Sequence, residues 1–159
     1  SPRRVQVELW MQRLGALALL ALVVAAALDA LGPRSASTSS TSARGDVSVE
    51  YTSLTRPGVD SEVTVTITPQ APRDTYQLAI DQSAIAALGL TDIHPAPAEQ
   101  TARGSQVVLE FLGSQAEVFE VVFSGRVPTQ QPMGRTAWSV EWLDDGIAGP
   151  LEARTVVLP

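Results

Sequence analysis

The stretch SEVTVTITP, residues 61–69, decides the fold class of this chain. Val63, Val65 and Ile67 alternate with polar residues at a period of two, so one face of the segment is apolar and the other carries hydroxyls and a carboxylate. This period is typical of a β-strand that packs on a core with one face and meets water with the other. The pattern predicts an amphipathic strand over residues 62–68.

The same alternation recurs on both sides of this stretch. It predicts six further strands, over residues 47–51, 76–80, 107–111, 119–123, 138–142 and 151–158. Turn-forming Gly, Pro and Asp residues separate the strands, apart from a short helical or irregular passage over residues 85–90 that leads into a Pro-rich turn. Seven short strands of this kind predict an all-β domain over residues 46–159, an antiparallel β-sandwich of immunoglobulin or fibronectin-III type.

Ahead of this domain lies an apolar run, LGALALLALVVAAALDAL, over residues 14–31, with Asp29 as its one ionisable side chain. As a helix it spans roughly 27 Å, close to the hydrocarbon thickness of a bilayer. We therefore expect a single N-terminal transmembrane helix over residues 14–32, after a cytoplasmic or interfacial lead-in over residues 1–13. A cleaved secretory signal is the alternative, because residues 25–27 offer an A-x-A-like site; the length of the run favours an uncleaved signal anchor.

Charge predicts the direction of this anchor. Arg3, Arg4 and Arg13 precede the apolar run, whereas Arg34 and Arg44 are the nearest cations after it. The positive-inside rule then places the N-terminus in the cytoplasm and the C-terminal domain outside it. The chain has no lysine, so arginine and one histidine are its only basic residues. The preference for arginine over lysine, together with abundant alanine, is typical of a GC-rich bacterial genome. The predicted location is a bacterial cell membrane.

Residues 33–45 join the two parts and include the run SASTSSTSA. Such a polar run has too little apolar surface to offset the entropy lost on ordering it. We expect a flexible Ser/Thr-rich linker.

Composition excludes several classes of function. Residues 45–159 carry six arginines against fifteen acids, so phosphate backbones would repel the domain and nucleic acid is not an expected partner. The chain has no cysteine and one histidine, His94, which removes thiol chemistry and any thiolate or multi-histidine metal site within one chain. The sequence also lacks the common hydrolase, metalloprotease and nucleotide-binding motifs. We expect no enzyme activity and no cofactor.

Two groups of residues are candidate binding surfaces. Small residues and one acid recur at alternating spacings of three and four, which places them on one stripe of the helix where a second helix can approach: Gly15, Ala18, Leu22, Ala25 and Asp29. Asp29 at the end of the run has a simpler interpretation, that it lies among the lipid headgroups. Trp138 and Trp142 lie on one face of a predicted strand, either in the core or as an exposed aromatic platform.

Two functional hypotheses follow. The first is a non-enzymatic, single-pass accessory subunit embedded in the lipid bilayer, which associates with a larger membrane protein, or with its own copies, through its helix and its exported β-domain. The second is a tethered extracytoplasmic module that binds a glycan or a peptide. A fragment freed from the helix would keep its binding only under the second hypothesis.

Overall fold

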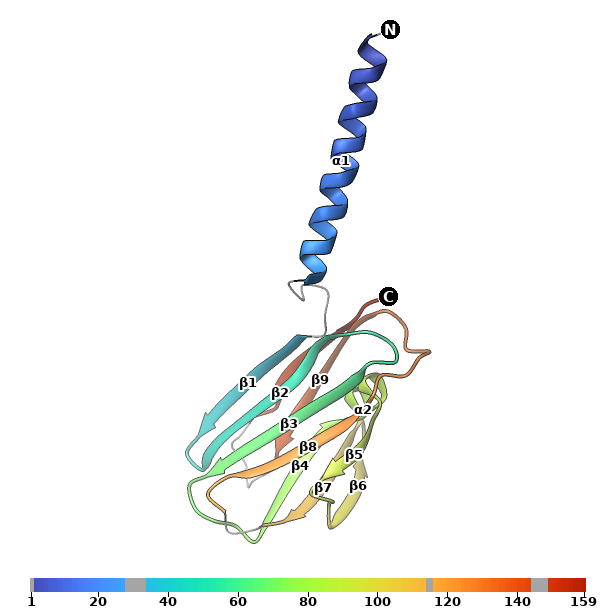
Figure 1. Cartoon of the computed structure of the whole chain (residues 1–159). Coiled ribbons are helices and arrows are strands. Elements are labelled where there is room, and N and C mark those ends of the chain that lie inside the picture. The colour runs from blue at the N-terminus through green and yellow to red at the C-terminus, as the bar shows by residue number, and fades with distance from the viewer. Residues whose placement is uncertain (1, 28–33, 114–115, 144–148) are drawn as a thin grey trace. The chain divides into compact units, whose positions relative to one another are not determined.

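The computed structural model describes residues 2–27, 34–113, 116–143 and 149–159 (Figure 1). The chain divides into two compact units, residues 1–32 and residues 33–159. Helix α1 belongs to the first unit, and all described strands belong to the second.

Helix α1 (Pro2–Ala27) is rich in leucine and alanine, which are strong helix formers, and proline is well tolerated in a first turn. Its described leucine and valine side chains from Leu14 to Val24 are 47–65% exposed. Within the described residues, we find no helix with the length and apolar character needed to cross a membrane. The predicted span ran from residue 14 to residue 32, and residues 28–32, Asp29 among them, lie outside the described residues.

The second unit is mostly β. Its described strands are β1 (Arg34–Ser42), β2 (Gly45–Thr55), β3 (Asp60–Pro69), β4 (Thr75–Asp81), β5 (Leu90–His94), β6 (Glu99–Arg103), β7 (Gln106–Leu112), β8 (Phe119–Arg126), β9 (Gly134–Trp142) and β10 (Leu151–Val157). The seven strands expected from the alternation are all present, as β2, β3, β4, β7, β8, β9 and β10. The all-β class of this unit is therefore confirmed, and β1, β5 and β6 are additional strands.

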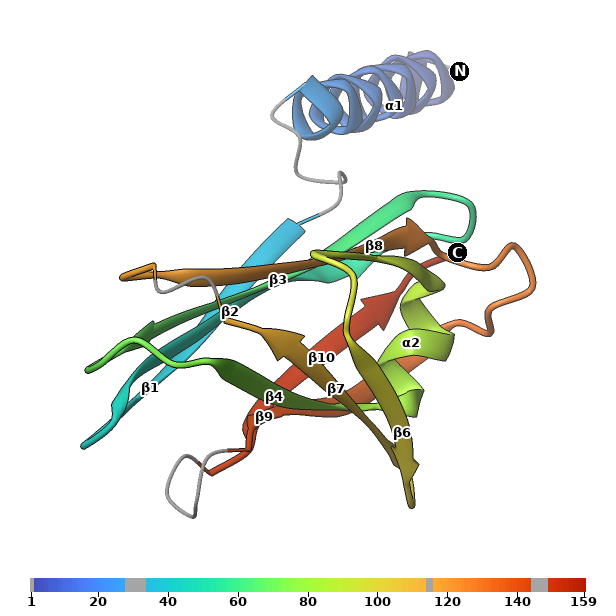
Figure 2. The same cartoon turned by 90° about the horizontal axis from the view of Figure 1, so that it is seen from below.

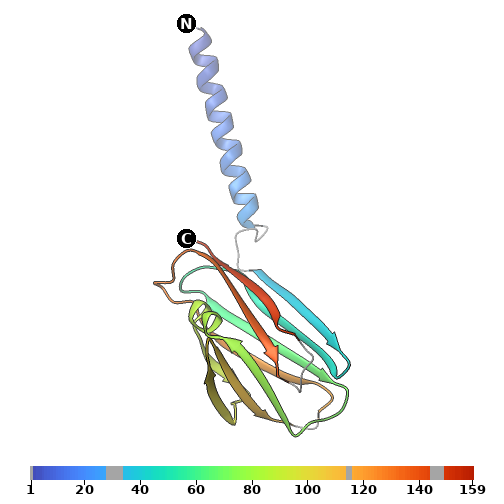
Figure 3. The same ribbon diagram turned by 180° about the vertical axis from the view of Figure 1, so that it is seen from behind.

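The strands form one sheet that curls into two facing layers (Figures 2 and 3). The hydrogen-bonded order is β5-β8-β3-β2-β10-β9-β4-β7-β6, with β1 also paired to β2. Neighbours are antiparallel except β2 and β10, which run parallel over the residue pairs Leu54–Val156 and Thr55–Val157. This short parallel pairing joins the two layers, so the predicted pair of sheets is in fact one curled sheet.

The core lies between the layers and is filled by the apolar faces of β2, β3, β4, β7, β8, β9 and β10, together with Leu90 of β5. Tyr76 of β4 stacks on Phe119 of β8 with ring centroids 4.3 Å apart, and Tyr51 of β2 meets Trp138 of β9 edge-on at 5.2 Å. These aromatic contacts cross from one layer to the other. Val63, Val65 and Ile67, the residues that predicted the fold class, are completely buried.

Helix α2 (Gln82–Leu88) follows β4 and buries Ala84, Ala87 and Leu88. Asp81 stands at its N-cap but makes no capping hydrogen bond from its side chain. Instead its carboxylate accepts hydrogen bonds from the backbone N–H of Ser139, at 2.6 Å, and from the Ser139 hydroxyl, at 2.9 Å. The acid at the end of β4 thereby stabilises the pairing of this region with β9.

The Ser/Thr-rich segment differs from our prediction. Residues 34–42 form β1, an antiparallel strand paired to β2 from Arg34–Leu54 to Ser42–Gly45, where we expected a flexible linker over residues 33–45. The prediction was wrong here because the segment has no apolar alternation of its own. Its order comes from backbone pairing with β2, and the Ser42 hydroxyl also donates to the carbonyl of Gly45 at 3.0 Å.

Candidate functional site

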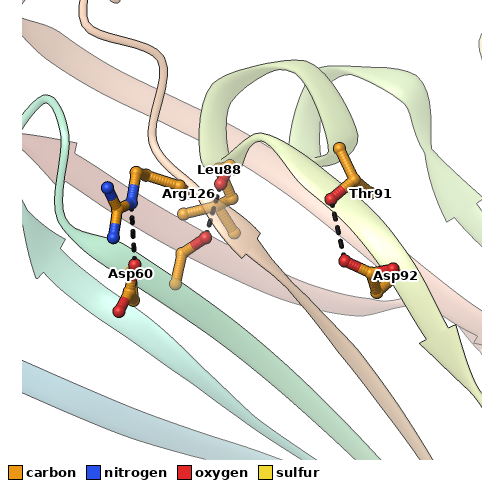
Figure 4. Close-up of polar contacts among 6 residues, drawn as sticks. Asp60, Leu88, Thr91, Asp92 and Arg126 are labelled. Carbon is orange, nitrogen blue, oxygen red and sulfur yellow. Dashed lines mark hydrogen bonds and ion pairs between the residues drawn. The ribbon is translucent and has the colours of Figure 1, made fainter.

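A shallow groove of about 550 Å³ crosses one layer of the sheet near the ends of β3, β5 and β8. All of its lining residues except one glycine have polar side chains: Thr52, Asp60, Ser61, Glu62, Thr91, Asp92, Ser124, Gly125 and Arg126. Figure 4 labels four of these lining residues, Asp60, Thr91, Asp92 and Arg126, and shows Asp60 of β3 facing Arg126 of β8.

The groove carries an excess of negative charge. Arg126 Nε lies 2.9 Å from Asp60 Oδ1, but both side chains are more than two-thirds exposed, so this ion pair contributes about 1 kcal/mol or less. Asp92 accepts a hydrogen bond from the Thr91 hydroxyl at 3.1 Å, and Glu62 adds a third carboxylate. Three carboxylates against one guanidinium favour a cationic or hydroxyl-rich ligand.

Gly125 lines the groove, and Gly89 lies against it at the start of β5. A Cβ on Gly125 would lie 1.9 Å from the carbonyl oxygen of Gly89, and a Cβ on Gly89 would lie 2.0 Å from the carbonyl oxygen of Arg126. Gly89 also has a φ of 62°, a left-handed conformation that L side chains rarely adopt. The close approach of β5 to β8 therefore requires glycine at both positions. Ser61, buried nearby, donates its hydroxyl proton to the carbonyl of Leu88 (Figure 4).

The lining of the groove contains no histidine, and its ionisable groups are three carboxylates and one guanidinium. In the part of the chain that the structure describes, no three His, Asp or Glu side chains lie close enough together to hold a metal ion. His94, the single histidine, is exposed at the end of β5, where it pairs with Val122 of β8. The groove is therefore described by its exposed hydroxyls, carboxylates and guanidinium group.

A second, smaller hollow of about 140 Å³ lies on the other layer, over β4, β6 and β7. Gln77, Glu99, Thr101, Val108 and Glu110 line it. Glu99 and Glu110 face each other directly across the β6–β7 pair, an unfavourable arrangement for like charges. Gln77 Nε2 donates a hydrogen bond of 2.7 Å to Glu110 Oε2, and the Thr101 hydroxyl lies 3.5 Å from Glu99 Oε1.

The two tryptophans do not form an exposed platform. Trp138 and Trp142 are each 3% exposed and belong to the core, as the packing interpretation predicted. Trp138 Nε1 donates to the Thr155 hydroxyl at 3.2 Å, and the Arg73 guanidinium lies 5.3 Å from the ring centre of Trp142. Phe119 and Phe123 are buried as well, so the aromatic face expected as an alternative is absent from these strands. The reason is that the apolar side of β9 faces the opposite layer.

The predicted helix stripe is only partly visible. Gly15, Ala18 and Leu22 lie in α1 and are exposed, whereas the side chain of Ala25 and all of Asp29 lie outside the described residues. A Cβ on Gly15 would meet no heavy atom within 4 Å.

Sequence reasoning missed the residues of both hollows. Asp60, Asp92 and Arg126 are separated by tens of residues, and only the β3–β8 and β5–β8 pairings bring them together. A weak signal existed for the second hollow, because Glu99, Thr101 and Arg103 recur at every second position before Gly104, as polar residues on the outer face of a strand would.

Fold and surface together define an all-β domain with polar outer faces, joined to an apolar N-terminal helix. No family model matches the chain, and no curated protein matches its sequence. Among solved structures, the chain is similar to a non-cellulosomal cohesin from the hyperthermophilic archaeon Archaeoglobus fulgidus. The two are 16% identical, the alignment covers 69% of this chain and 88% of the cohesin, and the TM-score is 0.38.

Proposed function

We propose that this protein is a non-enzymatic, single-pass accessory subunit of a bacterial membrane. In this proposal its N-terminal helix lies in the bilayer and associates with a larger membrane protein, and its β-domain covers or organises the exported surface of that partner. The N-terminus is cytoplasmic and residues 33–159 are extracytoplasmic.

The observation that carries the proposal is the apolar surface of α1. From Leu14 to Val24 every residue is Leu, Val, Ala or Gly, and the described leucines and valines are 47–65% exposed on all sides of the helix. A helix that is apolar all round needs an apolar surrounding, either lipid or other helices. The apolar run continues in the sequence to Leu31, beyond the described end of the helix, which gives it the length to span a bilayer.

The β-domain supports a binding role in place of a catalytic one. The two layers of the β-domain face each other as in a β-sandwich. We propose that this sandwich is of immunoglobulin or fibronectin-III type. Such domains host many unrelated tasks, so the assignment of a role rests on the surface and not on the fold. That surface offers hydroxyls and carboxylates on open strands, which suit protein contacts of moderate polarity.

A tethered ligand-binding module is the second candidate. The groove over β3, β5 and β8 favours it, because about 550 Å³ lined by hydroxyls and carboxylates can hold a short basic peptide segment. A glycan is less favoured as the ligand, because the glycan hypothesis depended on an exposed aromatic platform and Trp138 and Trp142 are buried.

The deciding experiment is affinity purification of the full-length tagged chain from native membranes in mild detergent, with mass spectrometry of the proteins that co-purify. We expect one integral membrane protein in a stoichiometric amount. Ala18→Leu, which fills the small-residue stripe, should reduce recovery of that protein about tenfold, because close helix contact depends on small residues there.

Ala16→Leu is the matched control, since it makes the same change on the opposite side of the same helix and should leave recovery unchanged. A chain that leaves the membrane on carbonate washing, or that purifies alone from every detergent tested, would contradict the proposal. A peptide partner retained by the released domain would favour the second candidate instead.

A further inference from the structure

The curled sheet has three edge strands in the described part of the chain: β1, β5 and β6. An edge strand presents unpaired backbone N–H and C=O groups, so a further strand can add to it. A second copy of the chain could add its own edge strand there in antiparallel orientation. This pairing is favourable only where the side chains that come to lie opposite each other are compatible.

Two of these edges do not favour a defined self-association. Antiparallel copies of β5 centred on Asp92 would place two carboxylates opposite each other, and the β5–β8 register is irregular between Leu90 and Asp92. β1 carries no charge from Ser35 to Ser42, so nothing in its side chains selects one register over another.

The third edge is self-complementary. β6 reads Glu-Gln-Thr-Ala-Arg, and Glu99, Thr101 and Arg103 lie on one face because side chains alternate along a strand. Two antiparallel copies centred on Thr101 would place Glu99 opposite Arg103 of the second copy, and the two-fold symmetry would repeat this pair. All five residues of β6 are exposed, and β6 lies at the end of its layer beside β7 alone (Figure 2).

The charges of β6 are also incompletely balanced within one chain. Three side chains form a row across the paired strands β4, β7 and β6: Gln77, Glu110 and Glu99. The row therefore ends at the sheet edge with two adjacent carboxylates, those of Glu110 and Glu99. Arg103 faces Gln106 instead, and within the described residues Arg103 forms no ion pair. The Arg103 guanidinium of a second copy would extend the row and neutralise part of its charge.

We propose that two copies of this chain associate edge to edge through β6, in antiparallel orientation about a two-fold axis at Thr101. The sheet layers of the two copies then form one continuous sheet, and Glu99–Arg103 pairs fix the register on both sides of the axis. The contact is small against the roughly 1,200–2,000 Å² of a stable interface, so the dimer is weak in dilute solution. It strengthens where both copies are held at high local concentration.

The chain has no cysteine, which permits a direct test with single substitutions in the full-length protein. In the proposed dimer Thr101 faces its counterpart at the separation of opposite residues in an antiparallel pair, about 4.5–5.5 Å between Cα atoms, which suits a disulfide. Purified Thr101→Cys in detergent micelles, under mild oxidation, should form a disulfide-linked dimer about tenfold faster than Ser39→Cys, the matched probe on β1, or Thr91→Cys on β5.

Charge exchange tests the register in the Thr101→Cys background. Arg103→Glu should slow cross-linking about tenfold or more, because it sets two carboxylates against each other at both pairs. Glu99→Arg should do the same with two guanidinium groups. The double variant Glu99→Arg with Arg103→Glu restores opposite charges at every pair and should restore cross-linking.

Circular dichroism spectra identify any variant that fails to fold, and the restored double variant shows that neither position is needed for folding. Equal cross-linking of all three single-cysteine chains, or faster reaction at Ser39→Cys, would overturn the proposal, as would a double variant as slow as the singles. None of these variants changes α1, so the outcome is separate from the search for a membrane partner.

Discussion

At the scale of single residues, Thr155 joins three strands. Its side chain is completely buried in β10, accepts a hydrogen bond from Trp138 Nε1 on β9 and donates one of 2.9 Å to the carbonyl of Thr52 on β2. Only a hydroxyl can accept and donate in this way in so small a volume. The residue stands close to the short parallel pairing of β2 with β10 that joins the two layers.

Thr155→Val should therefore lower the free energy of unfolding by about 1–3 kcal/mol. Valine matches the shape of threonine but leaves the indole N–H of Trp138 buried without a partner. Thermal unfolding of the full chain, followed by circular dichroism in mild detergent, measures the loss as a lower midpoint.

Thr155→Ser is the control, because it keeps the hydroxyl and loses only a methyl group. Its midpoint should lie between those of the parent and Thr155→Val. If Thr155→Val unfolds at the same midpoint as the parent chain, the two hydrogen bonds of the Thr155 hydroxyl do not stabilise the fold.

At the scale of elements, β1 shows how a segment can be ordered by its neighbour. No face of residues 34–42 is apolar, and none of its side chains is fully buried. Its backbone groups pair with β2 instead, whose other edge pairs with β3. Backbone pairing of this kind is insensitive to side-chain pattern, which is why the composition of β1 misled the prediction.

Amide hydrogen exchange tests the order of β1. About half of the amides between Ser35 and Ser42 should exchange slowly, because alternate residues of an edge strand direct their N–H groups toward the paired neighbour. The loop over residues 128–133 provides the reference for fast exchange in the same sample. Exchange as fast in β1 as in that loop would mean that the segment is a flexible linker after all.

At the scale of the whole molecule, the chain consists of a helical unit and a β unit that begins at Pro33. The β unit buries its own core, which includes side chains from both layers and from α2. It should fold without the helix, provided that β1 stays attached. The domain boundary predicted at residue 46 removes this strand and leaves an edge of β2 unpaired.

Two fragments test this boundary. Residues 33–159 should unfold cooperatively, with the β-rich circular dichroism spectrum of the intact chain. Residues 46–159 should unfold at a lower temperature, on the order of 5–10 °C lower for a loss of about 2 kcal/mol, and should aggregate more readily through the bared edge of β2. Equal midpoints would mean that β1 contributes nothing to the stability of the domain.

The sequence by itself determined the all-β class, seven of the strands and most of the core. Period-two alternation reports directly on burial, because a strand that packs on one face must repeat apolar residues at every second position, as Val63, Val65 and Ile67 do. The same logic favoured burial of Trp138 and Trp142, and local composition located the short helical passage near α2.

The tertiary structure alone decided how the strands close and which polar residues meet. The parallel contact of β2 with β10 joins residues about a hundred positions apart, and no local pattern encodes it. The groove of Asp60, Asp92 and Arg126 and the row of Gln77, Glu110 and Glu99 depend on strand register, which is set by pairing across the sheet. Solvent-facing residues carry no periodic hydrophobic signal, so their neighbours become known only when the sheet is assembled.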